Sequence, residues 1–303
     1  MIRIELQVEL NYQVDAYGAD FLFNVHAAHT RSQVVTAERL TLSQAVDAPL
    51  YTDPATGNRC MRLHAEPGEL HLSYAATVEL IHHFADPGRI FEVPVRDLPP
   101  EVIGYIYPSR YCQSDRLLRL AASEFGMLTQ GYSRVQAIRD WVYNHIAYNS
   151  NTTNSSTSAV DTLVERVGVC RDFAHLMIAL CRAVCIPARF VTGTNFGSDA
   201  ALGPPDFHAY VEVYLGDRWY LFDPSGLAVP MGLVRFGTGR DAADVAFATI
   251  FGNVLSRVPS ISAVAVEDRE DGAVLPFHCR EALSTDSTGK AVSDLEDVAR
   301  TRA

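Results

Sequence analysis

A cysteine stands where a helix is expected to begin, in the run GVCRDFAHL at residues 168–176. Apolar residues recur at helical spacing through this run and beyond it, which predicts a helix over residues 169–184 with Cys170 in its first turn. The unpaired N–H groups at a helix start favour a thiolate over a thiol and can also stabilise an oxyanion beside the sulfur. Cys170 is therefore a candidate nucleophile for acyl transfer.

A β-hairpin is predicted downstream of this helix. Residues 208–215 alternate as a strand does, Gly-Asp at residues 216–217 is a two-residue turn, and residues 218–222 return as a second strand. A two-residue turn favours pairing of Leu215 with Arg218. This register decides which side chains share a face of the hairpin.

In that register a histidine and a carboxylate become neighbours. Tyr210 faces Asp223, and His208 lies two residues further along the same face, about 7 to 8 Å from Asp223 at the backbone. A register shifted by one residue would place the two side chains on opposite faces. With Cys170, the pair would supply a nucleophile, a base and a carboxylate that orients the imidazole.

The motifs around these three residues resemble those of the transglutaminase-like superfamily. The similarity lies in GVCRDFAHL around Cys170, ALCRAVCIPARFVTG after it, DFHAYVEVYL around His208 and WYLFDPS around Asp223, and it covers about residues 110–260. The start of the chain and the later segment FGTGRDAADVAF are similar to a bacterial branch of the family, which carries a β-rich domain before the core.

The resemblance implies a papain-like α/β core in which Cys170, His208 and Asp223 form a catalytic triad and Cys170 forms a thioester with an acyl donor. Relatives include protein cross-linkers, cysteine peptidases, peptide N-glycanases and members without catalysis, so the acceptor stays open. A dedicated transamidase must exclude water and bind an amine. We therefore predict a cysteine peptidase or amidase that acts on a peptide or protein substrate. The alternatives are a protein-glutamine transglutaminase and a non-catalytic peptide-binding module.

Four further residues are candidates to support the nucleophile. Val169 and Arg171 flank the cysteine at the start of the helix. Asp172 is expected to cap the first turn or to pair with Arg189. Tyr148 is a candidate donor to the oxyanion, by analogy with groups that family members place before the nucleophile.

The whole chain predicts an α+β protein in three parts. Residues 1–100 alternate and are cut by proline and glycine turns, which indicates an N-terminal antiparallel β-sandwich-like domain. Residues 101–280 form the transglutaminase-like catalytic domain, with the Cys170 helix packed on an antiparallel sheet. Residues 281–303 are polar and are expected to form a loosely held C-terminal tail.

Shorter elements are also predicted. Strands are expected at residues 21–26, 39–42, 62–63, 70–74, 77–81 and 260–266, and helices at residues 115–125, 133–145 and 241–251. Ser114 and Ser133 are candidate N-caps of the first two helices. The polar run at residues 149–158 is either a passive surface connector or a lining of the cleft beside Cys170.

Composition sets limits on partners and cofactors. The chain has 303 residues, of which 48% are hydrophobic, and this is enough for two domains with buried cores. A net charge of −11 without a basic patch argues against a nucleic-acid partner. No apolar run approaches the roughly 18 residues of a membrane span. The sequence does not specify the oligomeric state.

The start of the chain indicates its location, and the spacing of histidines and cysteines bears on metal binding. Residues 1–10 alternate as a half-buried strand rather than as a signal peptide, so a cytoplasmic location with six reduced cysteines is expected. Close pairs such as His82-His83 and His278-Cys279 lack the CxxC or HExxH spacing of zinc sites. We therefore expect no metal and no other cofactor.

Overall fold

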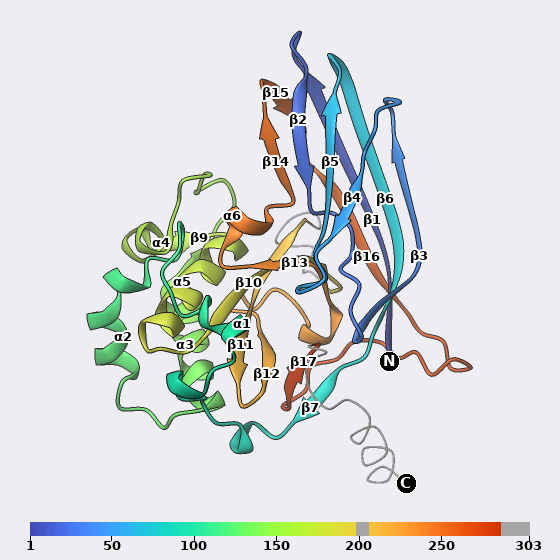
Figure 1. Ribbon diagram of the computed structural model, residues 1–303. Helices are drawn as coiled ribbons and strands as arrows, with labels where there is room; N and C mark the ends of the chain where they lie inside the picture. Colours follow the sequence, from blue (N-terminus) through green and yellow to red (C-terminus); the bar gives the residue numbers. More distant parts are fainter. Residues whose placement is uncertain (198–205, 286–303) are drawn as a thin grey trace.

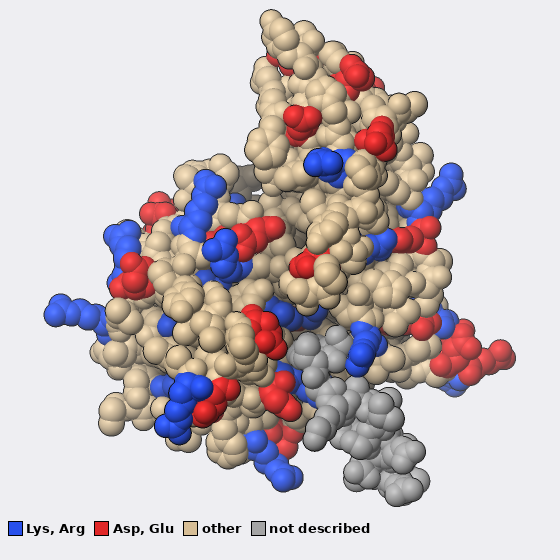
Figure 2. All heavy atoms as spheres, in the orientation of Figure 1, with Lys and Arg blue, Asp and Glu red and all other residues tan. Residues whose placement is uncertain are grey.

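Antiparallel β-sheets form one half of the molecule, and a sheet covered by helices forms the other (Figure 1). The computed structural model describes residues 1–197 and 206–285. The predicted α+β fold is confirmed, with a β-rich N-terminal region and a core in which the Cys170 helix packs on an antiparallel sheet. On the face shown in Figure 2, acidic and basic side chains are interspersed.

The β-rich half holds its core between two sheets. Strands β15-β1-β6-β3 form one sheet, with β16 also paired to β1, and strands β14-β2-β5-β4 form the other. Every second residue of β1 from Ile2 to Leu10 is buried, as the alternation predicts. The strands are β1 (Ile2–Val14), β2 (Ala19–Phe23), β3 (Gln33–Leu42), β4 (Leu50–Thr52), β5 (Arg59–Ala65), β6 (Gly68–Leu80), β14 (Ala248–Phe251), β15 (Val254–Ser256) and β16 (Ser260–Val266).

Strands from late in the sequence complete these two sheets. The predicted strand at residues 260–266 is confirmed as β16, but it pairs with β1 rather than within the catalytic sheet. The helix predicted at residues 241–251 is wrong beyond its first turn. Only α6 (Ala242–Val245) is helical, and Ala248–Phe251 forms β14 against β2. Pairing to the edge of an existing sheet satisfies the backbone there and overrides the weak helical pattern.

The second half is built on the four-stranded sheet β12-β11-β10-β13. Helix α5 packs on β10 and β11, and α2, α3 and α4 pack against α5. The elements are α1 (Pro100–Ile103), α2 (Leu118–Phe125), α3 (Tyr132–His145), α4 (Ala159–Glu165), α5 (Cys170–Ala183), β10 (Ala188–Asn195), β11 (His208–Leu215), β12 (Arg218–Phe222) and β13 (Leu233–Gly239). Helix α5 is buried on nearly all sides because other elements surround it.

The helix starts differ from the predicted N-caps. Ser114 opens a short 3-10 turn ahead of α2, and α3 begins one residue before Ser133, so neither serine caps a helix. Gly131 precedes α3 with a φ of 135°, a conformation that favours glycine, and its N–H donates to Glu92 at 2.9 Å. A tertiary contact thus takes the place of a local cap.

Helix α4 was not predicted, although its capping signal is present in the sequence. The hydroxyl of Ser158 accepts from the N–H of Asp161, and the carboxylate of Asp161 accepts from the N–H of Ser158. This is the reciprocal capping box. The last residues of the predicted polar loop therefore belong to a helix start, and Ser158 is buried.

The end of the described chain is part of the fold. Strand β17 (Ala282–Ser284) is buried and pairs with β7 (His83–Ala85), so a loose tail beginning at about residue 281 is wrong for these residues. The remainder of the predicted tail, residues 286–303, lies outside the described residues. Within the described chain, none of the helices has the length and apolar character that crossing a bilayer requires.

Candidate active site

The hairpin register places His208 beside Asp223. Strands β11 and β12 pair with Leu215 opposite Arg218, as predicted, and Gly216 has the positive φ of 63° that the two-residue turn requires. The Nε2 atom of His208 lies 3.3 Å from Oδ2 of Asp223, although the two are not aligned as a hydrogen bond. Their side chains are 4% and 3% exposed. The predicted proximity is confirmed.

Asp223 is held by three donors besides the histidine. The N–H and the hydroxyl of Ser225 donate to Oδ1 at 2.9 and 2.6 Å, and the N–H of Ala228 donates to Oδ2 at 2.9 Å. Sequence analysis missed Ser225, although an aspartate that accepts from the residue two positions later is a common turn signal. These contacts fix the direction of the carboxylate toward His208.

Burial and charge act in opposite directions on this pair. Burial alone would lower the pKa of His208, but the charge of Asp223, 3.3 Å away, is the main cause that raises that pKa above its ordinary value. Burial alone would raise the pKa of Asp223, but the charge of His208 and the surrounding donors lower it. Both shifts favour the charged forms of the pair, an imidazolium and a carboxylate.

Cys170 is the first residue of α5 and is partly exposed. Its Sγ lies 3.9 Å from the carbonyl oxygen of Phe207, the residue before His208. Cys170 thus lies beside His208 and Asp223, and the residue is partly exposed. This arrangement can carry out nucleophilic attack with proton transfer.

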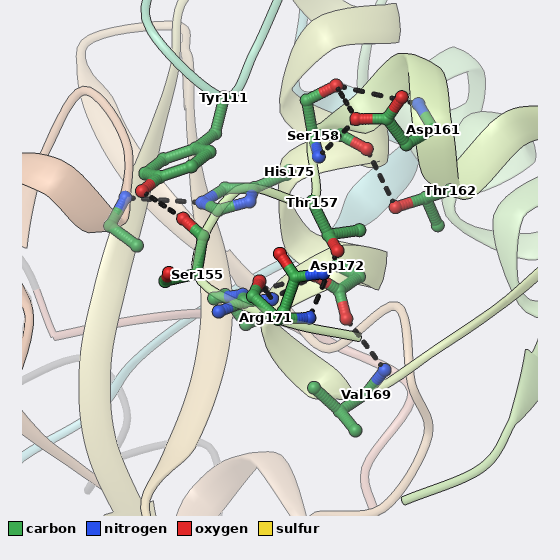
Figure 3. A network of polar contacts seen from close by, with 12 residues as sticks. Tyr111, Ser155, Thr157, Ser158, Asp161, Thr162, Val169, Arg171, Asp172 and His175 are labelled. Carbon is green, nitrogen blue, oxygen red and sulfur yellow. Dashed lines mark hydrogen bonds and ion pairs between the residues drawn. The ribbon is translucent and has the colours of Figure 1, made fainter. Parts of the chain in front are cut away.

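Asp172 secures the turn that presents the cysteine (Figure 3). Its Oδ2 accepts from the N–H of Val169 at 3.0 Å, so the predicted capping is confirmed. The alternative pairing with Arg189 is wrong. Asp172 pairs with Arg171 at 2.8 Å, and Arg189 pairs with Glu212, the residue opposite it in the β10–β11 register.

The polar loop at residues 149–158 is anchored to this turn. The guanidinium of Arg171 donates to the carbonyl oxygen of Asn154 at 2.8 Å. The hydroxyl of Tyr111 donates to the carbonyl oxygen of Ser155 at 2.6 Å (Figure 3). The loop is therefore attached to the start of the helix that bears Cys170, and its lining of the cleft stays a prediction.

A short parallel bridge brings Tyr148 toward the nucleophile. Strand β8 (Ala147–Tyr148) pairs with β9 (Val167–Gly168), with Tyr148 opposite Gly168, and the N–H of Asn149 donates to the carbonyl oxygen of Gly168 at 3.0 Å. Burial, followed by the charges of Cys170 and Asp223 among the smaller causes, raises the pKa of Tyr148. The hydroxyl stays protonated near neutral pH and can donate to an anion.

His175 lies on α5 but is not part of this group. It is fully buried, its ring stacks on Tyr111, and its Nε2 accepts from the N–H of Ala242 at 3.2 Å. Burial lowers the pKa of His175 well below its ordinary value, so the ring is neutral and supports packing. In the described part of the chain, no three His, Cys, Asp or Glu side chains gather as a metal site would require.

Comparison with known proteins identifies the family. Residues 120–224 match the transglutaminase-like superfamily, and residues 2–101 match the bacterial transglutaminase N-terminal domain. The chain is also similar to the structure of a proposed cysteine protease from Cytophaga hutchinsonii, with 43% identity, a TM-score of 0.86, and coverage of 93% of this chain and 97% of that one. This protein belongs to the transglutaminase-like superfamily, and these likenesses support a thiol-dependent enzyme.

Two mycobacterial relatives match a shorter region. An uncharacterized protein of Mycobacterium leprae is 33% identical over 117 residues, and one of Mycobacterium tuberculosis is 34% identical over 125 residues. Each match covers 37% of this chain, and 42% and 40% of the respective relatives. The chain thus spans about two fifths of the length of these relatives.

Proposed function

We propose that this protein is a cysteine hydrolase that cleaves peptide or glutamine-type amides through a thioester on Cys170. The observation that carries the proposal is the buried ion pair of His208 and Asp223 beside a partly exposed cysteine at a helix start. A charged, water-excluded pair is costly unless it is well partnered. Here its position beside a nucleophile gives it a chemical role.

The mechanism proceeds in two halves. The thiolate of Cys170, beside the imidazolium of His208, attacks the amide carbonyl carbon. The N–H groups at the start of α5, together with the hydroxyl of Tyr148, donate to the oxyanion. The imidazolium of His208 gives its proton to the departing amine, which leaves a thioester. His208 then takes a proton from water, the resulting hydroxide attacks the thioester, and the carboxylic acid and the Cys170 thiolate are released. The imidazolium of His208 and the thiolate are thereby restored. Asp223 holds the ring in place and stabilises its charged form throughout.

Hydrolysis is preferred over transfer to an amine for a physical reason. Water reaches a partly exposed thioester without a binding site, whereas transfer requires that an amine be bound and water be kept out. The measurement is ammonia release from glutamine peptides, with and without a primary amine at millimolar concentration. We expect glutamate as the product in both cases. A predominant amide adduct would instead assign a transamidase.

A labelling experiment tests the nucleophile directly. Cys60 and Cys279 are also partly exposed, and burial raises the pKa of each, so they serve as internal references. We expect iodoacetamide to label Cys170 first near neutral pH, and turnover to be lost in Cys170→Ala but retained in Cys60→Ala. Equal labelling of all three cysteines, with no turnover of any amide, would favour a peptide-binding module.

A further inference from the structure

The residue before His208 has its backbone at the candidate active site and its side chain in another part of the protein. The carbonyl oxygen of Phe207 lies 3.9 Å from Sγ of Cys170. The Phe207 ring packs against the hydrophobic cluster that fills the β-rich half and reaches one face of the sheet β12-β11-β10-β13. Phe207 therefore links the surroundings of the sulfur to the packing of the β-rich half.

Two aromatic rings hold the Phe207 ring in place. The ring of Phe247 stacks on it, with the centroids 4.1 Å apart and an interplanar angle of 10°. The ring of Phe236 meets it edge-on, with the centroids 6.0 Å apart and an interplanar angle of 78°. One neighbour covers a face of the ring and the other stands nearly at right angles to it. The two contacts therefore restrict both the position and the tilt of the Phe207 ring.

The position of Phe247 is set from the N-terminal β region. Asn24 follows directly after β2, and its backbone N–H donates to the carbonyl oxygen of Phe247 at 3.0 Å. Its side-chain Nδ2 donates to the carbonyl oxygen of Ala246 at 2.8 Å. From Ala248 onward the same segment pairs with β2 as β14, and Figure 1 shows β14 beside β2, with α6 where the two halves meet. Phe247 is therefore fixed to a strand outside the matched core of residues 120–224.

His208 lies at an end of its strand, where such support matters. The β10–β11 ladder ends with the pair of Gly193 and His208, so Phe207 lies beyond the last paired residue. A terminal pair has a neighbouring pair on one side only and opens more easily than a pair inside the ladder. The stack of Phe207 on Phe247 provides contact on the open side. A shift of about 1 Å between reacting groups can lower a rate by about 10²-fold.

We propose that Phe207 and Phe247 are positioning residues, through which the N-terminal β region holds the backbone at residues 207–208 beside Cys170. The inference rests on the proposed function, because it concerns the same Cys170 and His208. It goes beyond that function by giving the N-terminal β region a part in the site. Loosening the stack should displace the imidazole from the sulfur without removing any reacting group.

Removing one ring of the stack tests this role. Phe247→Leu keeps an apolar side chain but removes the ring that covers Phe207, whereas Phe247→Tyr keeps the ring. We expect kcat for amide hydrolysis to fall by about ten-fold or more in Phe247→Leu, with KM within about two-fold, and to stay within about two-fold of the native value in Phe247→Tyr. Phe251→Leu, at a 58% exposed position at the end of β14, is the matched control and should keep the native kcat.

A double-variant cycle tests whether the two rings act together. If Phe207 acts through its stack on Phe247, the variant with both Phe207→Leu and Phe247→Leu should lose no more kcat than the more affected single variant, because the second substitution removes no further contact between them. Losses that multiply in the double variant would reveal independent effects and overturn the proposal.

Alkylation separates this inference from the proposed function, because it needs no amide turnover. Urea unfolding first establishes which variants are folded. We expect iodoacetamide to label Cys170 at pH 7 about five-fold or more slowly in Phe247→Leu than in the native protein, with labelling of the partly exposed Cys60 unchanged. Asn24→Ala removes the side-chain donor to Ala246 and leaves both rings in place, so it should slow labelling of Cys170 by a smaller factor. It is the test variant if Phe247→Leu does not fold.

The two hypotheses fail in different ways. Slower labelling of Cys170 in these variants supports the positioning role even if no amide is turned over. A native rate of Cys170 labelling in every folded variant overturns that role, even if Cys170 proves to be the nucleophile of an amide hydrolase.

Discussion

Replacing Asp223 by asparagine tests the role of the ion pair between His208 and Asp223. The amide oxygen can still accept both donors of Ser225, which bind Oδ1 in the native protein. Its NH₂ group would then face the N–H of Ala228 and Nε2 of His208, where Oδ2 now stands. A donor would meet a donor at one of these contacts, and the imidazolium would lose its counter-charge.

The size of the effect follows from burial. Leaving a buried charge unpaired costs about 3 to 5 kcal/mol. His208 avoids this cost by releasing its proton, because burial alone lowers its pKa and Asp223 is the main cause that raises it. The neutral ring cannot protonate the departing amine, so kcat/KM at pH 7 should fall by about 10³- to 10⁴-fold in Asp223→Asn. Since the pKa of His208 drops, the alkaline limb of the pH profile should move to lower pH.

The assay is amide hydrolysis from pH 5 to 10, combined with NMR titration of the histidine rings. Asp97→Asn changes an exposed carboxylate that contacts Arg96, outside the group of Cys170, His208 and Asp223, and should leave both readouts unaltered. If Asp223→Asn keeps kcat/KM within about three-fold of the native protein and the same pH profile, the pair does not act in proton transfer. In that case the reasoning from its charge is refuted.

Three further outcomes are expected. Urea unfolding should show a stability difference between the native protein and Asp223→Asn that shrinks at both ends of the pH range. It should shrink as pH falls below about 4, because folding lowers the pKa of Asp223. It should also shrink as pH rises above about 6.5, because folding raises the pKa of His208. Asp172→Ala removes the acceptor of the Val169 N–H and should cost about 0.5 to 2 kcal/mol and slow alkylation of Cys170; an unchanged alkylation rate would contradict its positioning role. Tyr148→Phe should lower kcat by about 10- to 100-fold with little change in KM, and an equal kcat would remove the hydroxyl from the oxyanion contacts.

Local sequence signals determined the central geometry of the site. The turn at Gly216 restricts the register of the hairpin, and the register alone makes His208 and Asp223 diagonal neighbours. The helix that begins at Cys170 follows from the apolar spacing after it, and the capping by Asp172 needs only three residues of separation. These contacts form between residues close in sequence, so their geometry could be predicted.

Contacts between distant segments were decided only by tertiary packing. The helix pattern at residues 241–251 gave way to pairing with β2, because a sheet edge offers more hydrogen bonds than a short isolated helix. Arg189 bonds Glu212 rather than Asp172, since the β10–β11 register puts the two opposite each other. A groove beside Asp223 needs residues 278–283 to return to β12, more than fifty positions later in the chain. Helical and strand periodicity describes one element at a time, and only the packed chain brings such elements together.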